Sequence, residues 1–131
     1  MKYLGIDFGS RQIGIAISDE GGTMAFPRTE IPNDKNVKEF IARMIEEEGV
    51  GAVVVGDTRA FNGGENRITE QADRFIAELT KLVTVPVHVA LEGGTSVEAA
   101  RFAPKGHTHD DAAAAAIILQ RFLDMHPSGV Q

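Results

Sequence analysis

The chain has 131 residues, of which 43% are hydrophobic and 24% charged, the proportions of a soluble globular protein. This length predicts a single domain spanning residues 1–131, and the absence of cysteine excludes disulfides and thiolate chemistry. The net charge of −6 argues against a non-specific nucleic acid binder, which is normally basic. No long apolar run or signal peptide is visible, so we expect a cytoplasmic protein that does not associate with membranes.

Three strands are predicted at the start of the chain. Apolar or alternating segments cover residues 3–8, 13–18 and 24–31, and glycine-containing turns at 9–10 and 21–22 separate them. Short connections of this kind join neighbouring antiparallel strands. We therefore expect an antiparallel three-strand meander.

The rest of the chain alternates helical and strand patterns. Helices are predicted from residue 37 to 45, 68 to 79, 95 to 102 and 108 to 124, and strands over residues 50–55 and 85–91, with a loop over 57–67. Strand–helix–strand units connect parallel strands through right-handed crossovers. The predicted fold is α/β: a mixed five-stranded sheet of RNase-H-like type, in which the meander adjoins two parallel strands and helices cover both faces.

Asp7 is the first candidate for chemistry. It lies in an apolar strand and points away from the side shared by Ile6 and Phe8. A carboxylate is costly to bury there unless it is paired or binds a cation. The alternative is a structural Asx turn with the Gly9–Ser10 connection.

Two more carboxylates are expected at the same edge. Glu92 follows the strand over residues 85–91, and ligand sites in such sheets cluster at the carboxyl ends of strands. Asp111 opens the last helix on one stripe with Ala115, Ile118 and Phe122, which should face the sheet. The structural alternatives are a solvated strand end for Glu92 and a helix cap for Asp111.

Convergence of Asp7, Glu92 and Asp111 would create a metal site that is also the catalytic site. Oxygen ligands select hard cations such as Mg²⁺ or Mn²⁺, and two such ions can support phosphodiester hydrolysis. Six residues are candidates for substrate binding; the alternative is ordinary surface charge for the arginines and a solvated loop for the histidine. They are Gly9, Ser10, Arg11, Arg59, Arg67 and His109.

Four segments resemble the YqgF family, the RuvC-like Holliday junction resolvases that are also called RuvX or pre-16S rRNA nucleases. Residues 5–19 resemble its opening signature, 53–56 its central strand, 92–99 its Glu-containing segment and 111–120 its closing helix. The resemblance implies an RNase-H-like, divalent-metal nuclease with Asp7, Glu92 and Asp111 as its acidic site. It also implies a structured nucleic acid as partner: the 5′ end of pre-16S rRNA or branched DNA.

The chain departs from the family pattern next to Glu92. It has Leu91-Glu92-Gly93 where the family usually has Asp-Glu-Arg, and Gln12 where a basic residue is common. Two other hypotheses remain: a non-catalytic module that binds nucleic acid or protein, and an actin-like phosphate-binding domain. A symmetric junction would most simply be cut by a homodimer, so a dimer is one expected state.

Overall fold

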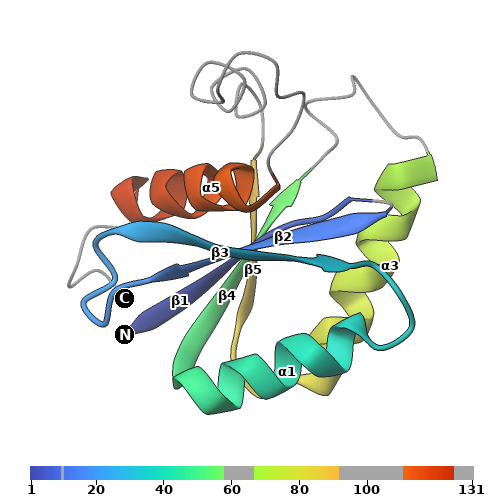
Figure 1. Cartoon of the computed structure of the whole chain (residues 1–131), viewed down its shortest axis with the longest axis horizontal. Helices are drawn as coiled ribbons and strands as arrows, with labels where there is room; N and C mark the ends of the chain where they lie inside the picture. The colour runs from blue at the N-terminus through green and yellow to red at the C-terminus, as the bar shows by residue number, and fades with distance from the viewer. Residues whose placement is uncertain (10, 58–66, 92–110, 126–131) are drawn as a thin grey trace.

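The computed structural model describes residues 1–9, 11–57, 67–91 and 111–125. In this part of the chain there are five strands and three helices (Figure 1). They are β1 (Lys2–Asp7), β2 (Gln12–Ser18), β3 (Ala25–Pro32), α1 (Val37–Glu48), β4 (Val50–Asp57), α3 (Arg67–Leu82), β5 (Val87–Leu91) and α5 (Asp111–Met125). The short helix predicted over residues 95–102 lies outside the described residues.

The strands form one mixed sheet in the order β3-β2-β1-β4-β5. Strand β2 is antiparallel to both β1 and β3, whereas β4 is parallel to β1 and to β5. The predicted meander and the two parallel strands are therefore confirmed. Strand β1 is central, and it is flanked by β2 through the pair Asp7–Gly14 and by β4 through the pair Ile6–Val55.

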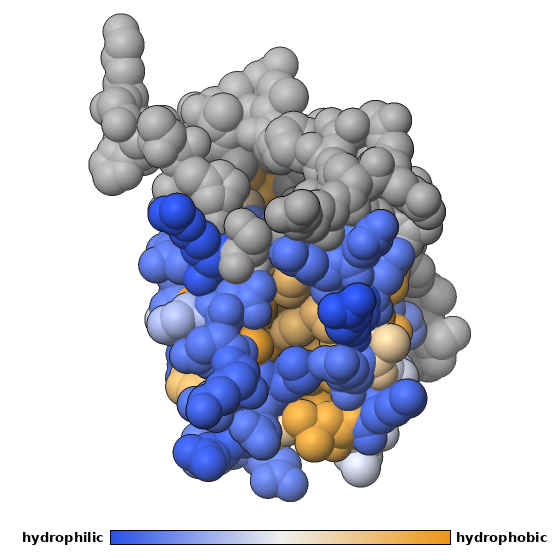
Figure 2. Space-filling view, turned by 90° about the vertical axis from the view of Figure 1, so that its right-hand side faces the viewer, coloured by the Kyte–Doolittle hydropathy of each residue, from blue (hydrophilic) through white to orange (hydrophobic). Residues whose placement is uncertain are grey.

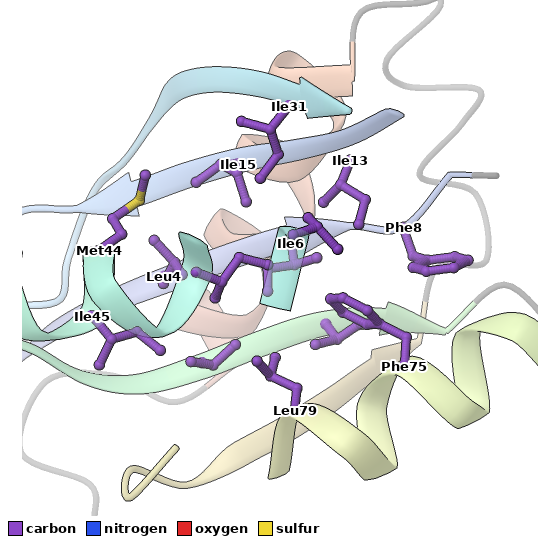
Figure 3. Packing of buried hydrophobic residues seen from close by; sticks show 14 of the residues in the cluster. Leu4, Ile6, Phe8, Ile13, Ile15, Ile31, Met44, Ile45, Phe75 and Leu79 are labelled. Carbon is purple, nitrogen blue, oxygen red and sulfur yellow. The ribbon is translucent and has the colours of Figure 1, made fainter. Parts of the chain in front are cut away.

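One face of the sheet is covered by α1 and α3 (Figure 1). Alternate residues of the strands, including Leu4, Ile6 and Ile15, are fully buried there. Phe8 packs against Phe75 of α3, with ring centroids 5.1 Å apart (Figure 3). The alternation of Ile6 and Phe8 on one side and Asp7 on the other is thereby confirmed.

The opposite face is covered by α5, which packs against residues such as Ala16 and Val54 (Figure 1). Ala115 and Ile118 of α5 are buried against the sheet and Phe122 is partly buried beside them, so the predicted inward stripe is confirmed for its described members. The small side chains on both surfaces allow the helix and the strands to approach closely.

Several boundaries differ from the sequence prediction. Asp57 ends β4 and Arg67 begins α3, so both belong to regular elements and not to the loop predicted over 57–67. Strand β5 begins at Val87 and not at residue 85, because Pro86 has no N–H to donate; its carbonyl instead accepts a hydrogen bond of 2.9 Å from the N–H of Val53. Among the described helices, none is long and apolar enough to cross a membrane.

Candidate active site

The three parallel strands end at one edge of the sheet. Strands β1, β4 and β5 run in the same direction and finish at Asp7, Asp57 and Leu91. In sheets of this kind, ligands bind outside the carboxyl ends of the strands. This edge is therefore where a functional site is expected.

Asp7 is one of two polar residues among the described residues that are buried, with 6% of its surface exposed. It projects from the face that α5 covers. On β2 it is paired with Gly14, and on β4 Gly56 follows Val55, the partner of Ile6. Because both neighbouring positions are glycine, neither β2 nor β4 places a side chain directly beside the carboxylate. A buried carboxylate is costly unless it is paired or binds a cation, and its oxygens suit a hard cation.

Helix α5 runs antiparallel to β1 and so begins at the Asp7 edge. Phe122, near the end of α5, contacts Tyr3 near the start of β1, with ring centroids 6.0 Å apart. One turn earlier, Leu119 and Ala115 lie over Gly5. Another turn, about 6 Å along the helix axis, leads to the first residue, Asp111.

The two elements therefore carry Asp7 and Asp111 to the same edge. From Gly5, β1 advances about 6.6 Å to reach Asp7, nearly the same distance that α5 covers from Ala115 to Asp111. The structure describes the backbone of Asp111 but not its side chain. Its predicted role as a metal ligand remains a prediction.

The connection between β1 and β2 is closely packed beside this edge. A side chain at Gly9 would collide with the backbone oxygen of Gln12, so glycine is required by space. Asn33, which follows β3, stabilises the same connection with two hydrogen bonds. Its Nδ2 donates to the carbonyl of Gly9 at 2.7 Å, and its backbone N–H donates to the carbonyl of Arg11 at 2.8 Å. Arg11 itself is exposed here.

Asn33 was not among the residues predicted to lie at the site. No local signal connects residue 33 with a turn more than twenty positions earlier in the chain. Only the pairing of β2 with β3 brings the two segments together, since Gln12 is opposite Pro32.

The other predicted site residues cannot be placed in the same way. Arg67 is the first residue of α3, and its side chain is outside the described part. Glu92, Ser10, Arg59 and His109 lie entirely outside it. Within the described side chains, no three His, Asp or Glu residues gather to form a metal site.

The strand order and the aspartate at the end of the central strand define an RNase-H-like fold of the resolvase type. A model of the RuvX family, described as Holliday junction resolvase, matches residues 1–125. The chain belongs to this family, which makes it a nuclease, a hydrolase of phosphodiester bonds.

Relatives and solved structures agree with this assignment. A protein of Oleidesulfovibrio alaskensis is 42% identical over 102 residues, covering 76% of this chain and 70% of the relative. A protein of Thermoanaerobacter pseudethanolicus is 34% identical over 134 residues, covering 95% and 96% of the two chains. Both relatives are named for pre-16S rRNA nuclease activity.

The fold is shared with two solved resolvases. RuvC of Thermus thermophilus has a TM-score of 0.59 at 17% identity, over 95% of this chain and 96% of that chain. The fowlpox virus resolvase, solved with Holliday junction DNA, has a TM-score of 0.60 at 16% identity, over 95% and 98%. At these identities the likeness establishes the fold.

Proposed function

We propose that the chain is a divalent-metal-dependent nuclease of structured nucleic acid, with Asp7, Glu92 and Asp111 as ligands of Mg²⁺ or Mn²⁺. The observation that carries the proposal is the buried Asp7 carboxylate at the edge where α5 begins. Carboxylate oxygens are the donors that these ions prefer, and the positions that flank Asp7 on β2 and β4 are glycines, which carry no side chain.

Each residue has a separate task in this proposal. Asp7 is held by the central strand, so its carboxylate has a fixed position from which to orient a bound ion. Asp111 approaches on a helix whose distance from the sheet is set by close packing. When bound, such ions lower the pKa of a water molecule and stabilise the departing oxygen of a phosphodiester. Arg11, exposed beside the edge, is proposed as a phosphate contact, together with Gly9, Ser10, Arg59, Arg67 and His109.

Two substrates follow from the comparisons: the 5′ end of pre-16S rRNA, from the names of the relatives, and branched DNA, from the family description. The decisive experiment incubates the protein and its Asp7→Asn variant with a pre-16S rRNA 5′ fragment and with a four-way DNA junction. Each reaction contains Mn²⁺, Mg²⁺ or EDTA. We expect metal-dependent cleavage that Asp7→Asn abolishes, and the substrate that is cut identifies the pathway.

Glu47→Gln is the matched control, because it removes one exposed carboxylate from the end of α1, away from the sheet edge. It should cleave like the parent. Mn²⁺ binding, measured by calorimetry, should be weakened by Asp7→Asn and unchanged by Glu47→Gln. A folded parent protein that binds nucleic acid but cuts neither substrate would favour the non-catalytic module.

A further inference from the structure

A groove lies between α1 and α3, on the face of the sheet opposite α5. Its volume is about 280 Å³, and Phe8 and Phe75 form its floor. The rim consists of polar side chains from the segment before α1 and from both helices: Asn33, Lys38, Gln71, Arg74 and Glu78. Figure 2 shows this side of the molecule, where apolar surface appears in a depression between hydrophilic ridges.

The groove suits a polar ligand better than an apolar one. Phe8 and Phe75 are only 6% and 4% exposed, because their rings pack against each other. An apolar side chain of a partner protein would therefore bury little further surface by entering. Most of what the groove offers is charge and hydrogen-bonding capacity at its rim.

The rim carries one cation that is not neutralised within the described part of the chain. Lys38 forms an ion pair with Glu78, with Nζ and Oε1 3.0 Å apart, so these two charges largely cancel. Arg74 is exposed and makes no ion pair with any described residue. A guanidinium with free donors is suited to bind a phosphate group in a bidentate manner.

The groove and the candidate active site both adjoin the connection between β1 and β2. Phe8 directly follows Asp7, and the two side chains point to opposite faces of the sheet. Asn33 lies on the groove rim and also donates to the carbonyl of Gly9 in the connection between β1 and β2. Residues on the groove rim and residues beside Asp7 are therefore neighbours through this one connection.

We propose that the groove between α1 and α3 holds the nucleic acid strand that adjoins the cleaved phosphodiester, with Arg74 as a phosphate contact. The inference rests on the proposed nuclease function, since it assumes a nucleic acid bound at Asp7. The groove would be a second contact region for the nucleic acid strand bound at Asp7, on the face of the sheet away from α5.

Binding is measured in the Asp7→Asn background, so that cleavage does not interfere. Fluorescence anisotropy gives the Kd for the labelled pre-16S rRNA fragment and the labelled four-way junction at several salt concentrations. Adding Arg74→Gln should raise the Kd several-fold and reduce the slope of log Kd against log salt by about 0.7 to 0.9, the value for one lost phosphate contact. The control Arg43→Gln makes the same charge change on the exposed surface of α1, outside the groove, and should have little effect.

A second variant is expected to change affinity in the opposite direction. Glu78→Gln removes the negative charge from the rim and releases Lys38 from its ion pair, so it should lower the Kd and steepen the salt dependence. A merely structural role of the rim would make both variants bind more weakly. The melting temperature of each variant verifies that these exposed substitutions leave the fold intact.

The outcomes separate this inference from the proposed function. Kd values and salt slopes of Arg74→Gln and Glu78→Gln that equal those of the Arg43→Gln control would overturn the groove alone. Absence of binding in both the unsubstituted protein and the Asp7→Asn variant would overturn both the groove and the nucleic acid assignment. Intact binding without cleavage by the unsubstituted protein would contradict the metal-nuclease proposal and leave the groove supported.

Discussion

Gly5 of β1 lies directly beneath Leu119 of α5. A β carbon built on Gly5 would be 2.8 Å from the Cβ of Leu119 and 3.0 Å from the carbonyl oxygen of Ala115. The carbonyl oxygen of Ala115 belongs to the backbone, so replacing the side chain of Leu119 would not relieve that contact. Any side chain at position 5 forces the helix to move away from the sheet, and the helix carries Asp111.

We therefore expect Gly5→Ala to destabilise the protein by about 1–3 kcal/mol, the usual cost of overpacking a core. Chemical denaturation measures this change. The variant should also bind Mn²⁺ more weakly, because displacement of α5 moves Asp111 relative to Asp7. Gly21→Ala is the control, since a β carbon there would meet nothing within 4 Å. Equal stability of the two variants would show that α5 is not held this closely.

Asn33→Ala should impair the site more than the fold. It removes the 2.7 Å hydrogen bond to the carbonyl of Gly9, beside Asp7. The expected loss of stability is about 1 kcal/mol, the usual contribution of one hydrogen bond. Cleavage, measured as kcat, should fall by a larger factor because the β1–β2 connection is no longer held. Asn36→Ala is the matched control, because Asn36 precedes α1 without a side-chain capping bond; a similar kcat for both variants would refute this role.

Gln120→Ala should loosen α5 from β3. The Gln120 Oε1 accepts a hydrogen bond of 2.9 Å from the N–H of Ala25, and its Nε2 donates to the carbonyl of Thr23 at 3.0 Å. Removing both bonds should cost about 1–3 kcal/mol, because partly buried backbone groups lose their partner. Thermal denaturation measures the change. Gln120→Glu keeps an acceptor for Ala25 but places its carboxylate against the carbonyl of Thr23 and against Asp124, to which Nε2 of Gln120 donates at 3.1 Å, so it should not recover the stability of the parent.

Asp19 should make stability depend on acid pH. Hydrogen bonds from the backbone N–H and the hydroxyl of Thr23, and from the N–H of Met24, lower the pKa of Asp19 below its usual value of 3.8. Folding therefore favours the charged form of Asp19, and this stabilises the folded state. The stabilisation is complete above the pKa that Asp19 has in the unfolded chain, and it disappears as the pH falls through the lower pKa of the folded state.

The Asp19→Asn variant tests this expectation, since it keeps the acceptor for Thr23 and Met24 but lacks the charge. Its melting temperature should lie below that of the parent at about pH 6, and the difference should shrink towards about pH 3. The control Glu20→Gln removes the neighbouring exposed carboxylate and should show a smaller difference at every pH. If the melting temperatures of the parent and Asp19→Asn differed by the same amount at every pH in this range, the lowered pKa of Asp19 would be contradicted.

The sequence was sufficient to predict the order of elements and the class of sheet. Alternation in β1 and β2 and helical spacing in α1 and α3 are local properties, so they are visible in a short window of residues. The same alternation placed Asp7 on the face opposite Ile6 and Phe8, as the structure confirms. The convergence of Asp7 with Glu92 and Asp111 stays a prediction, although the structure places the start of α5 at the correct edge.

The sequence by itself determined the helices and strands and their apolar faces. These depend on the pattern of residues that are two, three or four positions apart in the chain. Only the tertiary structure decided how far α5 sits from β1, since that depends on Gly5 meeting residues more than a hundred positions later. It also decided that Asn33 holds the connection beside Asp7 and that α1 and α3 leave a groove with Arg74 on its rim. These relationships arise from contacts between distant segments, and the chain encodes them only through the packing of the whole sheet.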